Sequence, residues 1–173
     1  MRRVAFAALV LVTAAGCDKK PPVQIDVADA PKHHEAKRFV VTSGELRRDL
    51  QGIHRWRSVN TNGRGGNRAP GPQHEMLVYP IVPEGWTKED PVPLWVTLSN
   101  QTRKQEGGAN AWLDDVEAAL KSPLRGKVMD YADREPGFRA TSGWQKAVDE
   151  AQERHGIVSD PHAPILMWPD PVQ

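Results

Sequence analysis

The sequence predicts an α+β domain with a small, mostly antiparallel sheet and about three to four helices packed on one face. Two observations lead to this prediction. Short β-prone apolar runs recur along the chain, and three segments repeat their apolar residues at helical spacing. A length of 173 residues suits one domain. We assign that domain to residues 38–173.

The first elements of this domain are predicted as a strand over 38–42 followed by a helix over 43–51. A capping-box pattern opens the second segment, and Leu46, Leu50 and Ile53 lie on one helical stripe. A helix is therefore expected directly after the first strand.

The middle of the chain is predicted to form a long loop followed by two paired strands. Residues 60–73 lack apolar periodicity and are dense in Gly, Asn and Pro, which is typical of a flexible loop. Residues 76–82 and 93–99 are β-prone, and we expect them to pair antiparallel. Within the second run, Trp95 alternates with aliphatic neighbours.

The last third of the chain predicts three helices and a final strand. Apolar stripes predict helices over 110–121 and 142–155, and a short helix is expected over 127–134. Gly156 suits the left-handed position after a helix. An apolar run over 164–168 predicts the closing strand.

The first sixteen residues have the pattern of a secretory signal peptide. A basic Met1–Arg3 precedes the apolar run Val4–Val12, and small residues follow over Thr13–Gly16. Ala14-Ala15-Gly16-Cys17 resembles the lipobox of bacterial lipoproteins. This resemblance implies cleavage before Cys17, a diacylglycerol on its thiol and an acylated amino terminus. The alternative is an ordinary signal peptide cut after Ala15, which leaves the chain's single cysteine as a free thiol.

The resemblance implies a protein held on the extracytoplasmic side of a bacterial membrane. Asp18 favours the inner membrane by the sorting rule of enteric lipoproteins. We expect residues 17–37 to form a flexible tether behind the lipid anchor. The alternation of Val23, Ile25 and Val27 leaves a short strand open as an alternative.

Charge is distributed unevenly between the two parts of the domain. Residues 37–68 carry eight basic and two acidic side chains, whereas residues 69–173 carry ten basic and sixteen acidic ones. The basic segment predicts a patch for anionic lipid headgroups, peptidoglycan or an acidic envelope protein, with Arg55, Arg57, Arg64 and Arg68 as its residues. The alternative is that the two parts pair with each other or are solvated. A net charge of +1 predicts no nucleic-acid partner.

A catalytic site is the less favoured reading of the histidines. His155 and His162 flank Asp160, and the three side chains are candidates for a hydrolytic site if they converge. His155 is also explained by the dipole at the end of its helix. With one cysteine and no zinc-protease motif, we expect neither a metal site nor a cofactor.

Six tryptophans are many for this length. Trp56 and Trp86 lie in or beside predicted loops and are candidates for stacking on sugar rings, while core packing is the alternative. The sequence therefore favours a membrane-anchored lipoprotein that binds or scaffolds without catalysis. The alternative is a glycan-binding or hydrolytic envelope enzyme.

Overall fold

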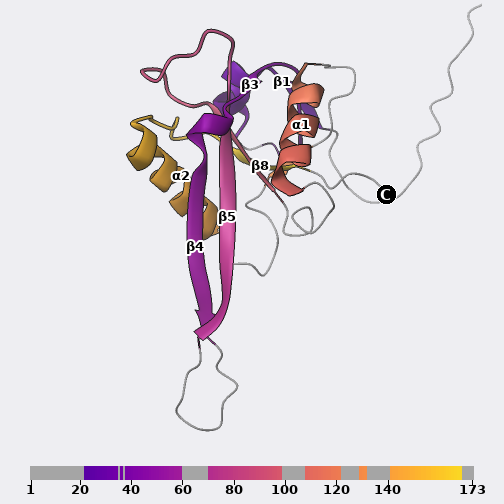
Figure 1. The fold of residues 1–173 in the computed structure, drawn as a ribbon. Coiled ribbons are helices and arrows are strands. Elements are labelled where there is room, and N and C mark those ends of the chain that lie inside the picture. Colours follow the sequence, from indigo (N-terminus) through magenta and orange to yellow (C-terminus); the bar gives the residue numbers. More distant parts are fainter. Residues whose placement is uncertain are drawn as a thin grey trace, which may run out of the picture.

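The computed structural model shows a curled, mixed sheet with helices on both faces (Figure 1). The structure describes residues 22–34, 36, 38–59, 70–98, 108–121, 129–131 and 141–168. The strands are β1 (Val23–Ile25), β2 (Arg38–Val41), β3 (Glu45–Leu46), β4 (Gly52–Val59), β5 (Pro70–Val82), β6 (Leu94–Leu98), β7 (Met129–Tyr131) and β8 (Ile165–Trp168). The helices are two α-helices, α1 (Gly108–Leu120) and α2 (Thr141–His155), and two 3-10 helices, η1 (Val27–His33) and η2 (Arg48–Leu50).

The strand order is β1-β2-β7-β8-β6-β5-β3, and β4 pairs with β5. The β1–β2 and β6–β8 pairs are parallel, and the other described pairs are antiparallel. β2 and β3 lie near opposite ends of this order, yet only residues 42–44 connect them. The sheet must therefore curl so that its ends approach. Gly44 permits this turn with a φ of +128°, and a Cβ built there would lie 2.8 Å from the Ile81 side chain.

The two α-helices pack on opposite faces of the sheet. Leu94 and Val96 of β6 join the buried cluster that contains Val116 of α1, whereas Trp95 joins the cluster that contains Val148 of α2. The central strands are thus apolar on both faces. The predicted fold class is therefore wrong: the sheet is mixed, the described residues hold two α-helices, and these do not share one face.

The helix predicted over 43–51 is also wrong, because this segment forms β3 and η2. Leu46 pairs opposite Ile81 and lies in the cluster on the α1 side, whereas Leu50 lies in the cluster on the α2 side. The apolar residues that matched a helical stripe are therefore divided between the two cores.

The short helix predicted over 127–134 is wrong where it can be compared. Residues 129–131 form β7, which pairs with β2 on one side and β8 on the other. The rest of the predicted helix lies outside the described residues. Pairing with two neighbouring strands has outweighed the local helical preference.

Most of the predicted tether belongs to the folded body. β1 pairs with β2, and η1 follows it directly. Ile25, Val27 and Ala30 are buried in the α1-side core, and the Ile25 carbonyl accepts a hydrogen bond from the Thr42 backbone. The alternative prediction of a short strand is therefore correct at residues 23–25. The flexible tether predicted over 17–37 does not include the described residues that form β1 and η1.

The expected pairing of the two central runs is confirmed, because β5 and β6 are antiparallel with Ile81 opposite Leu94. The last helix and strand are confirmed as α2 and β8. Gly156 ends α2 with a φ of +64°. Within the described residues, no helix is long and apolar enough to span a bilayer.

Candidate functional site

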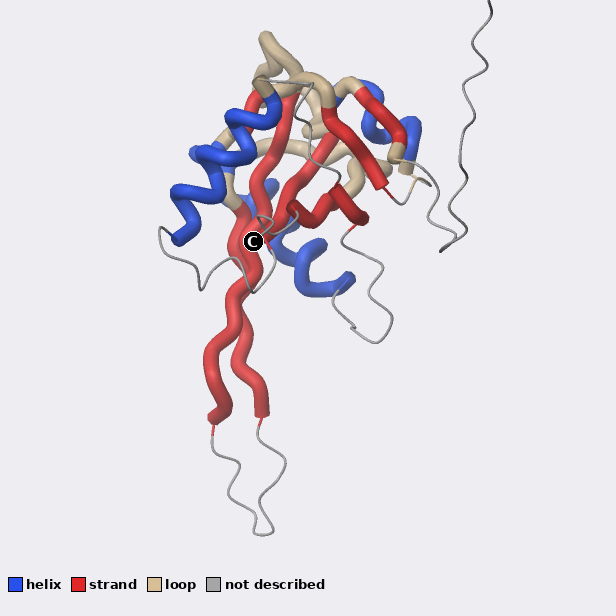
Figure 2. Tube along the Cα trace, turned by 90° about the vertical axis from the view of Figure 1, so that its right-hand side faces the viewer, coloured by secondary structure: helices blue, strands red, loops and turns tan. Residues whose placement is uncertain are grey.

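β4 and β5 continue well beyond the body as a two-stranded projection (Figure 2). β6 pairs with β5 only from Val78 to Ile81, so residues 54–59 and 70–76 form a pair that we call the ribbon. Four residues of the predicted loop, 70–73, are therefore strand. Residues 60–69, including Arg64 and Arg68, lie outside the described residues.

One face of the ribbon is polar and carries exposed arginines. Arg55 and Arg57 lie opposite Glu75 and Gln73 in the strand register. Arg55 Nε is 2.6 Å from a Glu75 carboxylate oxygen. Arg57 is exposed and forms no ion pair with any residue that the structure describes. The predicted binding residues Arg55 and Arg57 thus share one surface.

The other face of the ribbon carries a row of stacked rings. The Trp56 ring stacks on His54 at 5.6 Å and on His74 at 5.1 Å, with planes within 17° of parallel in both pairs. Trp56 is half-buried. Its ring is therefore already engaged by two imidazoles, which makes it a poorer platform for a sugar than the sequence suggested.

α2 packs against the base of the ribbon and fixes its direction. Gly52 approaches so closely that a Cβ there would lie 2.0 Å from the Ala147 carbonyl oxygen. The Glu150 carboxylate accepts the Ile53 backbone N–H at 2.8 Å. His155 Nε2 donates to the Gln51 carbonyl at 3.1 Å, since a carbonyl can only accept. These side chains satisfy backbone groups at the edge of β4, as buried or half-buried polar groups require.

The side chains of the three residues of the candidate hydrolytic site contact different groups. His155 engages Gln51 as described, whereas His162 stacks on His34 with ring centroids 5.0 Å apart. Asp160 accepts the backbone N–H of His162 at 2.8 Å within its own loop. None of these contacts joins one candidate side chain to another. Among the described residues, no three His, Cys, Asp or Glu side chains are grouped to hold a metal.

Trp86 lines a cleft of about 320 Å³ at the opposite end of the body from the ribbon. The other lining residues are Ala28, Pro31, Pro83, Glu84, Gly85, Asp90, Pro91, Pro93 and Asp160. The Trp86 indole N–H is buried and has no hydrogen-bond partner among the residues that the structure describes. The cleft therefore combines an aromatic ring, proline rings and carboxylates.

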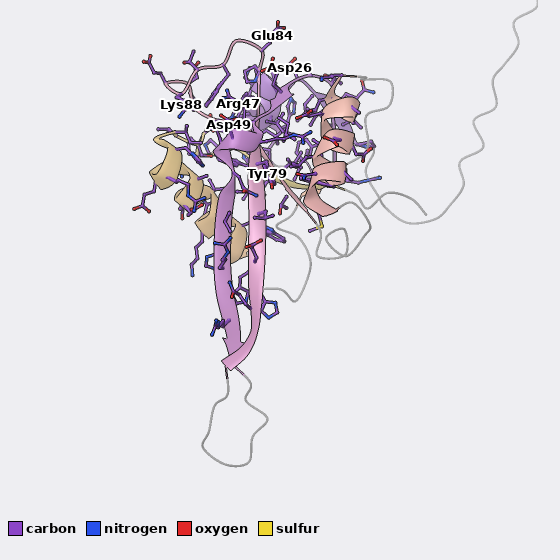
Figure 3. The ribbon with its side chains drawn as sticks, in the orientation of Figure 1. Asp26, Arg47, Asp49, Tyr79, Glu84 and Lys88 are labelled. Carbon is purple, nitrogen blue, oxygen red and sulfur yellow. The ribbon has the colours of Figure 1, made fainter. Side chains whose placement is uncertain are left out.

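Charged groups beside this cleft form hydrogen bonds and a cation–π contact with the residues around it. Figure 3 shows Arg47, Asp49, Glu84 and Lys88 at this end of the molecule. The Arg47 guanidinium lies 5.6 Å from the Trp86 ring centroid and donates two hydrogen bonds to Asp49, which lower the pKa of the Asp49 carboxyl. Hydrogen bonds from the Thr87 backbone and hydroxyl lower the pKa of Asp90.

Part of the basic segment pairs with the acidic part, as the alternative reading held. The Arg48 guanidinium reaches α1, where it bonds Glu117 at 2.7 Å and Asp114 at 2.6 Å. These bonds raise the pKa of Arg48. Arg48 is thus used inside the body, while Arg55 and Arg57 lie on the ribbon.

Comparison of the chain with protein-family models, with curated proteins and with solved structures found no match. The fold and the site are therefore interpreted from their own geometry. The sequence did not indicate the contacts that fix the ribbon, Ile53 with Glu150 and Gln51 with His155, because they join residues about a hundred positions apart. For Glu150, the sequence indicated only the i, i+4 pair with Arg154 on the same helix.

Proposed function

We propose that this protein is a bacterial envelope lipoprotein, anchored through Cys17, that binds an anionic partner with its ribbon and performs no catalysis. The ribbon is the observation that supports this proposal. Trp56 and Met76 of the ribbon pack against the cluster on the α2 side, whereas Arg55, Arg57 and Gln73 are exposed, so the outward part of the pair adds little to the stability of the domain. Contact with another molecule explains why the chain extends there.

The positive charge of the ribbon favours a partner that carries carboxylates or phosphates. The ribbon carries Arg55, Arg57 and one acidic residue, Glu75, and the sequence that joins its two strands adds Arg64 and Arg68. Guanidinium groups bind carboxylates and phosphates through two parallel hydrogen bonds. Such exposed charges give binding that weakens as salt screens it, with a Debye length of about 8 Å at physiological ionic strength.

The test uses the non-lipidated Cys17→Ser chain and two charge-matched variants. Arg55→Glu with Arg57→Glu reverses the charge of the ribbon, and Lys121→Glu with Lys146→Glu makes the same change in net charge at two exposed residues outside it. Sedimentation with purified peptidoglycan and with phosphatidylglycerol vesicles measures binding. We expect only the ribbon variant to lose salt-sensitive binding while it melts close to the parent. Equal loss in both variants would show that net charge, and not the ribbon, is responsible.

Anchoring has its own test, independent of the ribbon. The full chain should incorporate a fatty-acid analogue in cells, and Cys17→Ser should abolish incorporation and lipoprotein-type cleavage. Equal labelling of the variant would contradict the anchor. Binding by the ribbon would remain open to measurement on the soluble chain.

The Trp86 cleft supports glycan binding as a second candidate function. An indole beside carboxylates suits a sugar, because the ring stacks on the sugar face and the oxygens accept hydroxyl hydrogen bonds. Trp86→Ala should then weaken binding of peptidoglycan fragments, whereas Trp56→Ala, on the ribbon, should not. Equal affinities of both variants would reject the cleft. The hydrolytic alternative lacks comparable support, because the described contacts of His155, Asp160 and His162 do not join their side chains to one another.

A further inference from the structure

We infer that the β1 end of the domain faces the membrane that holds its lipid and that the ribbon points away from that membrane. This inference rests on the proposed lipid anchor at Cys17, and it narrows where the partner of the ribbon lies. It is carried by the short length of chain between the anchor and the first ordered strand, together with the direction of the ribbon.

The folded body begins soon after the cysteine. Val23 pairs with Phe39 in the sheet, and Ile25 is 3% exposed. Five residues lie between Cys17 and Val23, so six Cα–Cα steps join them. At no more than about 3.3–3.6 Å per residue, this segment spans about 20 Å at most, whatever its conformation. A tether that reached residue 37 would instead span up to about 70 Å.

This limit is short compared with the domain itself. A chain of about 150 residues folds to a radius of gyration near 15 Å, so its diameter approaches about 40 Å. A surface on the far side of the body therefore cannot reach the bilayer while β1 stays within about 20 Å of it.

The sequence of this short segment favours the same arrangement. Lys19 and Lys20 lie between the cysteine and β1. Each basic residue near an anionic membrane surface contributes about 1 kcal/mol of attraction. The segment is therefore drawn toward the headgroups and does not lift the domain away from them.

The ribbon points away from the β1 end. Figure 1 shows β1 in the upper part of the body, and Figures 1 and 2 both show the described end of the β4–β5 pair in the lower part of the molecule. α2 fixes this direction through the close approach of Gly52 to Ala147 and the bond from Ile53 to Glu150. The ribbon consequently faces the space beyond the membrane, and its anionic partner is not the bilayer that carries the anchor.

The experiment compares two variants of the lipidated full chain, each with a single fluorescent label. The label lies on β1 in one variant and on the ribbon in the other. Gln24 and Gln73 are both exposed strand residues, so Gln24→Cys and Gln73→Cys form a matched pair. Cys17 is the only native cysteine, and its acylation leaves the introduced thiol as the labelling site. The proteins are reconstituted in phosphatidylcholine vesicles that contain a lipid with a quencher on its headgroup.

We expect the label at residue 24 to be quenched and the label at residue 73 to keep its fluorescence. A long Gly/Ser insert between Pro21 and Pro22 should reduce the quenching at residue 24, because it removes the limit on distance. Equal quenching at both positions, or stronger quenching at residue 73, would overturn the inference. An unchanged signal after the insertion would do so as well.

This readout separates the inference from the proposed function. Flotation of the protein with the vesicles reports the anchor by itself, and a chain that fails to float refutes the anchor and this orientation together. A chain that floats with the wrong quenching pattern refutes only the orientation. Binding of the soluble chain to an anionic partner is measured apart from both.

Discussion

The inner and outer halves of the β4–β5 pair differ in burial and in the side chains that they carry. In the inner half, Val78 and Ile81 are fully buried between the cores on the two faces of the sheet. In the outer half, Arg55 and Gln73 are exposed, and ring stacking and one ion pair join the two strands. One continuous pair of strands is thus part of the core at one end and an exposed projection at the other. The contacts that hold the body should be far more costly to remove than those along the ribbon.

The largest expected effect compares one substitution on each side of this boundary. Trp95→Ala removes a fully buried indole that donates to Ser159 at 2.9 Å, and we expect a loss of about 3–5 kcal/mol in the free energy of unfolding. Trp56→Ala removes a half-buried ring stacked on two histidines, with an expected loss of about 1 kcal/mol. Urea unfolding measures both losses. Similar losses would abolish the distinction between body and ribbon.

A smaller effect is expected where α2 meets the base of the ribbon. Gly52→Ala places a Cβ 2.0 Å from the Ala147 carbonyl, so the helix or the strand must shift, at a cost of about 3 kcal/mol. Gly85→Ala is the control, because its Cβ would meet nothing within 4 Å and only the φ of +76° opposes it. Unfolding of both variants at the same urea concentration would contradict the close approach of α2 to β4.

Ile25→Ala tests whether β1 belongs to the body. Ile25 is buried in the same cluster as Ile81, so its truncation should cost about 2–3 kcal/mol. The neighbouring Gln24 is exposed, and Gln24→Ala should change the free energy of unfolding by less than about 0.5 kcal/mol. Equal stability of the two variants would return residues 23–25 to a tether. The short distance between anchor and domain would then no longer hold.

The sequence predicted the elements whose signals are local. The periodicity and terminal glycine of α2 and the alternating run of β6 were sufficient to locate both. Local signals failed where residues of one short segment divide between two cores, as Leu46 and Leu50 do. They also failed at β7, whose three described residues are held by strands distant in the sequence.

The candidate site was predictable in composition but not in geometry. The excess of arginine was visible in the sequence, and the fold places two of the predicted residues, Arg55 and Arg57, on one face of the ribbon. The extension of the strands into the predicted loop was not visible, because residues 70–73 have a turn-like composition. The division of the arginines also required the fold, since only the structure shows Arg48 bound to α1.

The smallest expected effect concerns a surface ion pair at the end of the body away from the ribbon. Arg47 donates to both oxygens of Asp49, and these bonds lower the pKa of the Asp49 carboxyl in the folded protein. The pair therefore contributes fully above the unfolded pKa of about 3.9, and its contribution is lost as the pH falls through the lower, folded value. Because the Asp49 side chain is 60% exposed, the contribution should stay below about 1 kcal/mol.

Asp49→Asn measures this contribution by urea unfolding at two pH values. The parent should exceed the variant slightly in stability at pH 7, and the difference should shrink as the pH is lowered below about 4, because protonated Asp49 and Asn are both neutral. High salt at pH 7 should reduce the difference too, as expected for exposed charges. Asp49 also holds the guanidinium that lies over Trp86, so the variant should loosen the rim of the cleft without altering the ribbon. A difference that persists unchanged at low pH would mean that the carboxylate charge is not its source.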